Sequence, residues 1–173
     1  MRGSATRSRP ATRRPCCGRG NGRHAPSAPR TALTPSGRRR SASRPTADSD
    51  HSDAESIANT FSVYATGINT GDYAQAYHAL TPASRRNFSL AEFAATHTSS
   101  YVFDVHVEAV RSTGGGVDQA TVRFTSVQDA DQGRDDQTCS LWRLQYRMTQ
   151  DGDGRWLIDR AVPERGYPIS CDG

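Results

Sequence analysis

The first apolar pattern along the chain has the period of a helix. Large apolar side chains recur at spacings of four, three and four residues, at Ile57, Phe61, Tyr64 and Ile68. This spacing places them on one helix face. Ser52 or Asp53 can cap the start, and Gly71 suits the left-handed conformation that often ends a helix. We therefore expect a long helix from about residue 53 to residue 70.

Two shorter helices are predicted next. Asp72 can cap the first of them, whose apolar face holds Tyr73, Ala76, Tyr77 and Leu80. The dipeptide Thr81-Pro82 is expected to end it. Ser89 and Glu92 have the spacing of a capping box, in which each side chain satisfies a backbone N–H of the other residue. The third helix then presents Leu90, Phe93, Ala94 and His97 on one face, where a histidine is more often part of the core than a functional group.

From Tyr101 the period changes to two, which is typical of strands. Tyr101, Phe103, Val105, Val107 and Ala109 are expected on one face, and Val102, Asp104, His106, Glu108 and Val110 on the other. Three more strands follow, around residues 120–124, 142–148 and 155–162, and the last two are joined by a strong turn at 151–154. Helices followed by hairpin-linked strands predict an α+β domain over residues 51–173, with helices packed on a curved four-stranded antiparallel sheet.

Two segments carry a family resemblance. They are Ile68-Asn69-Thr70-Gly71-Asp72-Tyr73-Ala74-Gln75-Ala76, at the end of the long helix, and Gly154-Arg155-Trp156-Leu157-Ile158-Asp159, in the last strand. With the element order, they make the chain resemble the nuclear transport factor 2-like and SnoaL-like superfamily of cystatin-like fold, and most of all its extracytoplasmic domains in actinobacteria. The resemblance covers about residues 53–162. It implies a cone of sheet and helices whose open end can hold a small apolar ligand.

The resemblance also bears on activity. The enzymatic branches, such as ketosteroid isomerases and polyketide cyclases, usually carry a hairpin between the second and third helices, and residues 81–88 are too few for one. This departure favours a non-enzymatic role. In such a cone some aromatic residues would line a pocket, although an aromatic stripe is more often plain core. The pocket candidates are Phe61, Tyr64, Tyr77, Phe93, Tyr101, Phe103, Phe124, Trp142 and Tyr146.

Cys139 and Cys171 are predicted to form a disulfide. The bridge would close a long loop, and this closure contributes about 3–4 kcal/mol to folding stability by chain entropy. It would also hold a C-terminal segment rich in Pro and Gly. The alternative is two unrelated thiols. Because disulfides persist in oxidising compartments, the bridge predicts an extracytoplasmic or envelope-associated protein. No secretory signal or membrane-spanning apolar run is visible in the sequence, which conflicts with that location.

Charge divides the chain. Residues 1–50 hold twelve arginines against two aspartates, whereas residues 51–173 hold ten arginines against sixteen acidic residues. The first segment has too few apolar residues to fold and is expected to be a disordered tail. It could tether nucleic acid through phosphates, but it lacks aromatics that stack on bases, and the acidic domain makes nucleic acid an improbable partner. Lysine is absent, which suggests a GC-rich, actinobacterial genome.

No catalytic, cofactor-binding or metal-binding residues are assigned from the sequence. Asp104, His106 and Glu108 share a strand face but are interpreted as a solvated face, and the aspartates of residues 129–136 as ordinary acidic turns. The predicted function is a non-enzymatic extracytoplasmic module that binds a partner protein or a small apolar ligand, and which could be a homodimer. The alternative is a small cyclase or isomerase. A buried carboxylate or histidine that faces the cone would favour the enzyme.

Overall fold

A computed structural model describes residues 44–171 of the 173-residue chain. Four helices precede the main strands: α1 (Ala54–Thr70), α2 (Tyr73–His78), α3 (Pro82–Arg85) and α4 (Leu90–Ala95). The strands are β1 (Thr46–Ala47), β2 (Tyr101–Gly114), β3 (Val117–Val127), β4 (Cys139–Gln150), β5 (Trp156–Pro163) and β6 (Ile169–Ser170). Two single-turn 3-10 helices, η1 (Ala130–Gln132) and η2 (Arg134–Asp136), join β3 to β4.

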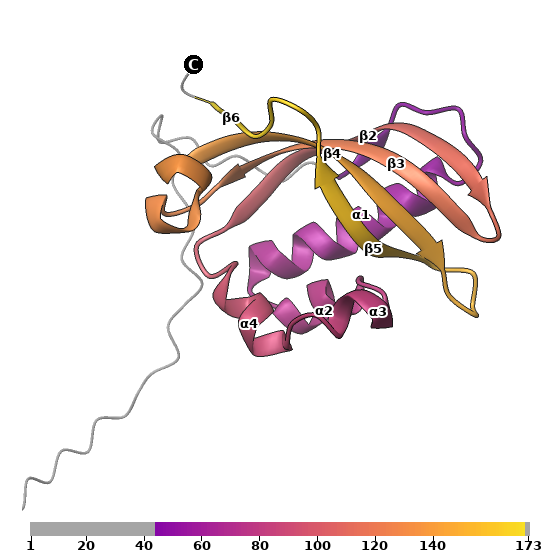
Figure 1. Cartoon of the computed structure of the whole chain (residues 1–173), viewed down its shortest axis with the longest axis horizontal. Helices are drawn as coiled ribbons and strands as arrows, with labels where there is room; N and C mark the ends of the chain where they lie inside the picture. The colour runs from indigo at the N-terminus through magenta and orange to yellow at the C-terminus, as the bar shows by residue number, and fades with distance from the viewer. Residues whose placement is uncertain (1–43, 172–173) are drawn as a thin grey trace, which may run out of the picture.

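The strands form one curved, mostly antiparallel sheet in the order β1-β2-β3-β4-β5, and β6 pairs with β4. The sheet curves over α1, and α2, α3 and α4 lie on the far side of that helix (Figure 1). The α+β prediction is therefore confirmed, and the four expected strands correspond to β2 through β5. The described sheet has two strands more than expected, because Thr46 and Ala47 pair in parallel with β2 and Ile169 and Ser170 pair with β4.

The helix boundaries follow from local chemistry. Gly71 ends α1 with a φ of 76°, and the Asp72 side chain accepts the Gln75 N–H at the start of α2. Ser89 and Glu92 form the expected capping box at α4. The turn α3 was not expected, because Thr81-Pro82 was interpreted only as a stop. Thr81 caps α3 through the Ser84 N–H at 3.1 Å, and Pro82 occupies a first-turn position where its missing N–H is not needed.

The helix α1 crosses α2 at very short range through Gly67. A Cβ at this position would lie 2.6 Å from the backbone nitrogen of Ala76 and 2.9 Å from its Cβ. No side chain larger than hydrogen fits between the two helices without moving one of them. This contact sets the distance between α1 and α2, and so the position of the helical layer formed by α2, α3 and α4.

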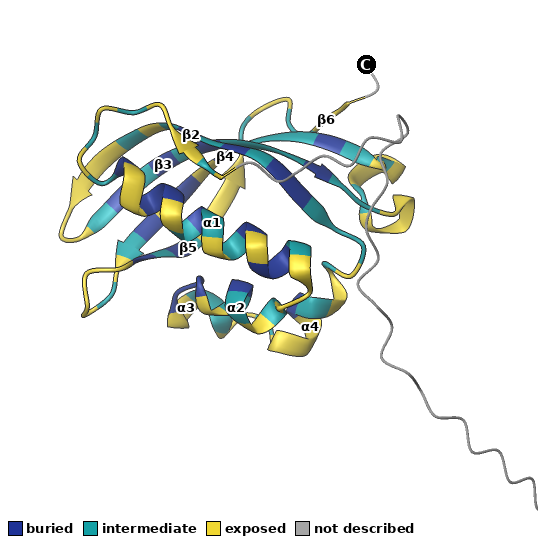
Figure 2. Cartoon of the chain, turned by 180° about the vertical axis from the view of Figure 1, so that it is seen from behind, coloured by how far each residue is buried: buried dark blue, intermediate teal, exposed yellow. Residues whose placement is uncertain are grey.

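The core lies between α1 and the concave face of the sheet. Figure 2 shows buried positions on α1 beside exposed ones, as expected for an amphipathic helix. Ile57 from α1 and Val107, Val122 and Met148 from the central strands are fully buried there. Strand β5 closes the core with Trp156 and Ile158.

One expectation for the first long strand is wrong. The strict alternation over residues 101–110 is interrupted at Asp104, whose φ is 52°, and the register with β3 shifts between Phe103 and His106. Such a bulge adds a residue to one strand and reverses which side chains face the core. Val102 therefore joins Val105 in the core cluster, while Phe103 does not.

The short strand β1 lies within the segment that was expected to be a tail, a few residues before the predicted domain boundary at residue 51. The remainder of that tail, residues 1–43, lies outside the described residues. The boundary itself stays a prediction. Among the residues the structure describes, none of the helices has the length and apolar character needed to cross a bilayer.

Candidate functional site: a cavity between the helices and the sheet

Two cavities open between the helical layer and the concave face of the sheet. One has a volume of about 360 Å³ and the other about 480 Å³. Five lining residues are common to both, which makes the cavities neighbours: Tyr64, Thr96, His97, Leu144 and Tyr146. We call the two together the cone cavity. Its combined size suits a small organic ligand.

The predicted aromatic residues divide between this cavity and other places. Six line it: Phe61, Tyr64, Phe93, Phe124, Trp142 and Tyr146. Tyr77, Tyr101 and Phe103 are not among its lining residues. A contact between a ligand and these three residues stays a prediction. The sequence reasoning also missed Phe88, which lines the cavity from the segment after α3.

The three excluded aromatics have structural reasons to lie elsewhere. The Tyr77 hydroxyl donates to the backbone carbonyls of Arg85 and Phe88, at 2.9 and 2.8 Å, and so fixes the chain between α3 and α4. Tyr101 and Phe103 precede the bulge at Asp104, which reverses their side of the sheet. Their rings contact each other at a centroid distance of 6.2 Å.

Two phenols inside the cavity keep their protons. Burial raises the pKa of Tyr64 to about 12. Burial, followed by the nearby Tyr64, also raises the pKa of Tyr146. Among the described residues neither hydroxyl has a hydrogen-bond partner. Both hydroxyls can therefore donate a hydrogen bond to a ligand oxygen.

His97 lines both parts of the cavity, and its tautomer follows from its contacts. Its Nδ1 lies 2.8 Å from the carbonyl oxygen of Phe93, which can only accept, so Nδ1 carries the proton. Burial lowers the pKa of His97 although the Phe93 carbonyl opposes this effect, and the ring is neutral at pH 7. The ring also packs on Phe93 at a centroid distance of 4.4 Å. Nε2 is consequently an unprotonated base on a fixed ring.

The acidic side chains at the cavity mouth are already engaged. Glu92 binds the backbone and side chain of Ser89, which lowers its pKa. Asp159 accepts hydrogen bonds from Thr81 at 3.1 Å and from Arg147 at 2.8 Å. Within the described lining, His97 is therefore the base best placed to accept a proton from a ligand.

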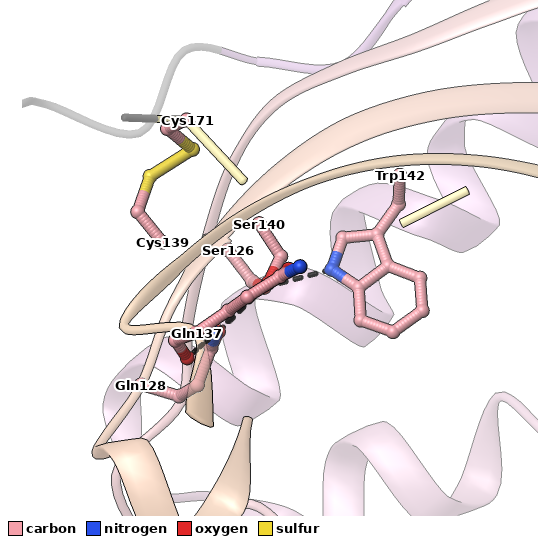
Figure 3. The surroundings of a disulfide bond; sticks show 7 residues. All are labelled: Ser126, Gln128, Gln137, Cys139, Ser140, Trp142 and Cys171. Carbon is pink, nitrogen blue, oxygen red and sulfur yellow. Dashed lines mark hydrogen bonds between the residues drawn. A yellow bond between two sulfur atoms is a disulfide. The ribbon is translucent and has the colours of Figure 1, made fainter. Parts of the chain in front are cut away.

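The far end of the cavity is built from hydrogen-bonded polar side chains beside the disulfide (Figure 3). Trp142 Nε1 donates to Ser126 Oγ at 2.9 Å, and Ser126 donates to Gln128 at 2.7 Å. Gln128 in turn donates to the buried Ser140 at 3.0 Å. This chain of contacts fixes the Trp142 ring as part of the wall.

The predicted disulfide is present. Cys139 at the start of β4 bridges to Cys171, with a Cα–Cα distance of 5.4 Å. The bridge ties the end of the chain to β4, where β6 adds only two residue pairs to the sheet. It lies at the sheet end that carries the polar network (Figure 3).

The sequence analysis interpreted one strand face, with Asp104, His106 and Glu108, as solvated. In the structure His106 and Glu108 contact different partners. Glu108 accepts hydrogen bonds from Arg143 at 2.7 Å and from Arg123 at 3.1 Å, and Arg143 also pairs with Glu164. His106 lies 2.7 Å from Thr46 in β1. In residues 44–171 the aspartates of the 129–136 loop do not form a group able to hold a metal ion.

Comparison with known proteins gives similarity of fold. No protein-family model matches the chain, and no curated protein matches it. A conserved protein from Planctomyces limnophilus is similar in structure, with 11% identity and a TM-score of 0.49, over 65% of this chain and 98% of that one. A ketosteroid isomerase-like protein from Erwinia carotovora atroseptica has 16% identity and a TM-score of 0.45, over 64% and 94% of the two chains.

A putative ketosteroid isomerase from Shewanella frigidimarina has 12% identity and a TM-score of 0.47, over 69% of this chain and 99% of that one. The likeness concerns the architecture.

Proposed function

We propose that the cone cavity binds a small, mostly apolar ligand that carries a carbonyl or similar oxygen. The observation that carries this proposal is the pair of phenols, Tyr64 and Tyr146, which line both parts of the cavity and whose hydroxyls have no hydrogen-bond partner among the described residues. A ligand oxygen could accept hydrogen bonds from these hydroxyls, and one neutral hydrogen bond contributes about 0.5–1.5 kcal/mol. The aromatic walls supply apolar contact area around it.

A paired titration tests this proposal. The probes are a bicyclic ketone and the hydrocarbon of the same shape, and binding to the full chain is followed by isothermal titration calorimetry. We expect the ketone to bind several-fold more tightly than the hydrocarbon, since one neutral hydrogen bond contributes about 0.5–1.5 kcal/mol. Equal affinity for both probes, or no binding of either, would contradict the proposal.

A matched pair of variants locates the binding. Thr96 is exposed and lines both parts of the cavity, whereas the exposed Thr98 two residues later is not among the lining residues. Thr96→Trp should block the entrance and abolish ketone binding, and Thr98→Trp should leave it unchanged. If the two variants bind alike, the ligand lies elsewhere.

A second candidate function is proton transfer of the isomerase or cyclase kind, and the tautomer of His97 favours it. Nε2 of His97 would take a proton from the carbon next to a bound carbonyl. The Tyr64 and Tyr146 hydroxyls would donate hydrogen bonds to the oxygen on which negative charge then develops. A histidine at the cone is the feature that the sequence analysis expected of an enzyme, and it supports this second candidate beside the predicted non-enzymatic role.

Deuterium exchange distinguishes binding from proton transfer. With a bound ketone in D₂O, we expect the protein to accelerate exchange at the α carbon, as measured by NMR of the ketone. His97→Gln should lower this exchange rate by a factor of about 10²–10⁴ and should leave ketone affinity unchanged. Exchange at the uncatalysed rate would leave the cone as a binding site without chemistry.

We further propose an extracytoplasmic location, which the disulfide supports. A bridge between Cys139 and Cys171 persists where thiols are not kept reduced. Peptide mapping of protein taken from native cells without reductant should recover the two cysteines as one cross-linked peptide. Recovery of both as free thiols would contradict this location.

A further inference from the structure

Three potential metal ligands meet at the opposite end of α1 from α4. They are His51, Asp53 and Asp118, and their donor atoms all lie within 4.8 Å of one another. His51 Nδ1 is 3.7 Å from Asp53 Oδ2 and 3.9 Å from Asp118 Oδ2. His51 and Asp53 precede α1, whereas Asp118 lies near the start of β3 on the core face. Only the fold brings Asp118 beside the other two, so no pattern in the sequence predicts the group.

Asp118 is an unusual side chain for its position. It is only 3% exposed, and its Oδ2 atom has no hydrogen-bond partner among the described residues. Leaving a carboxylate oxygen buried without a partner is costly, and such groups are normally paired or coordinate a metal ion. The same Oδ2 is the atom that faces His51.

The hydrogen bonds of His51 show which of its nitrogens is free of a proton. The backbone N–H of Asp53 can only donate and lies 3.2 Å from Nδ1, so Nδ1 is unprotonated. Nε2 then carries the proton, 3.0 Å from Ser112 Oγ. A ligating histidine is commonly held in this way through the hydrogen bond of its other nitrogen. The lone pair of Nδ1 and the two carboxylates therefore point toward one another. None of the three can donate a proton to the others, so a cation is the partner that all three could share.

Asp53 has no other evident use for its carboxylate. It occupies the N-cap position of α1, yet its side chain makes no capping hydrogen bond. An aspartate at this position normally binds the backbone of the first helical turn. Here its Oδ2 lies beside Nδ1 of His51 instead.

We propose that His51, Asp53 and Asp118 bind a divalent transition-metal ion of the Zn²⁺ class. One imidazole nitrogen and two carboxylates form a mixed nitrogen and oxygen donor set, whereas Ca²⁺ and Mg²⁺ prefer oxygen alone. Ligand atoms about 2.0–2.2 Å from one ion lie roughly 3–3.5 Å apart. The side chains must close in slightly, and the Asp53 N–H must release Nδ1. Three protein ligands leave room for water as a further ligand.

Calorimetric titration of the full chain with ZnCl₂ tests the proposal. Because Cys16 and Cys17 could bind zinc themselves, both are replaced by serine in every protein compared. We expect one zinc ion per chain, a zinc-dependent rise in the melting temperature, and no comparable effect of MgCl₂. Asp118→Asn and His51→Ala should each weaken zinc binding at least tenfold.

The matched control is His106→Ala. His106 Nδ1 lies 3.9 Å from Asp48 Oδ2, the same separation as between His51 and Asp118, but within residues 44–171 no third ligand joins this pair. This variant should bind zinc as the parent does. If Asp118→Asn fails to fold, His51→Ala and the partly exposed Asp53→Asn make the same comparison. Absence of zinc binding, or equal binding by the His51, Asp53 and His106 variants, would overturn the proposal.

Discussion

At the scale of single residues, the hydroxyl of Tyr146 allows a direct test of the proposed ligand contact. Its ring packs on Phe61 at a centroid distance of 4.8 Å, and phenylalanine would keep this contact. Tyr146→Phe should therefore leave stability almost unchanged and weaken ketone binding about three- to tenfold, the loss of one hydrogen bond. Calorimetry with the ketone and its hydrocarbon measures the change. Affinity for the hydrocarbon should not fall.

Tyr101→Phe serves as the control for this experiment, since Tyr101 is not among the residues that line the cavity. Ketone affinity should be the same in this variant as in the parent. A loss of ketone binding in Tyr101→Phe but not in Tyr146→Phe would contradict the assignment of the cavity.

Glu108 gives a prediction for pH dependence. Burial raises the pKa of its carboxyl, but hydrogen bonds and charge from Arg143 and Arg123 outweigh burial, and the net pKa is below the ordinary 4.5. A carboxylate with a lowered pKa stabilises the fold above the unfolded-state pKa and loses this contribution as pH falls through the folded-state value. Because the group is partly exposed, we expect about 1 kcal/mol.

Glu108→Gln should accordingly lower the free energy of unfolding by about 1 kcal/mol at pH 7, and the difference from the parent should vanish in acid. Urea denaturation at several pH values measures both effects. Asp131→Asn, at an exposed position, is the control and should change stability by less than about 0.5 kcal/mol. A difference that grows as pH falls would contradict this assignment.

At the scale of elements, the crossing of α1 and α2 depends on Gly67. Gly67→Ala places a methyl group against the backbone of Ala76 at 2.6 Å, so the helices must separate. We expect a loss of about 1–3 kcal/mol, as is usual for overpacking, in spite of the higher helix propensity of alanine. Gly152→Ala is the control, because a Cβ there meets nothing within 4 Å. Equal stability of the two variants would show that the helices do not approach so closely.

The elements also show what the sequence can and cannot predict. The ends of α1, α2 and α4 depend on residues within one turn of each other, so Gly71, Asp72 and the Ser89–Glu92 capping box were predictable. The bulge at Asp104 depends on pairing with β3, which periodicity within one strand does not contain. For this reason Tyr101 and Phe103 were predicted on the wrong side of the sheet.

The site was predictable to a similar degree. Aromatic residues in a cone-like fold pointed to Tyr64 and Tyr146, but His97 was interpreted as a core histidine on the third helix. The candidate role of His97 depends on the hydrogen bond between its Nδ1 and the Phe93 carbonyl and on the position of α4 opposite the sheet. The spacing of residues in the sequence predicts neither. His51 and Asp118 are further apart in the chain than Phe93 and His97, so their proximity could not be predicted from the sequence either.

At the scale of the whole molecule, the disulfide holds the last described residues to β4. The bridge spans 32 positions of sequence, and closing a loop of this length stabilises by about 3–4 kcal/mol through the entropy of the unfolded chain. Cys139→Ser combined with Cys171→Ser should lower the free energy of unfolding by that amount, as measured by urea denaturation. Reductant should destabilise the parent and leave the double variant unchanged. Equal stability of the two proteins without reductant would contradict the role given to the bridge.

The claim that joins these scales is that the cone cavity holds a small molecule. Native mass spectrometry of the full chain, purified from its source without reductant, tests it most directly. We predict an additional mass, typical of a small organic molecule, that is lost on denaturation and is absent from Thr96→Trp but present in Thr98→Trp. A bare polypeptide mass for the parent, together with no binding of the ketone probe, would contradict the account.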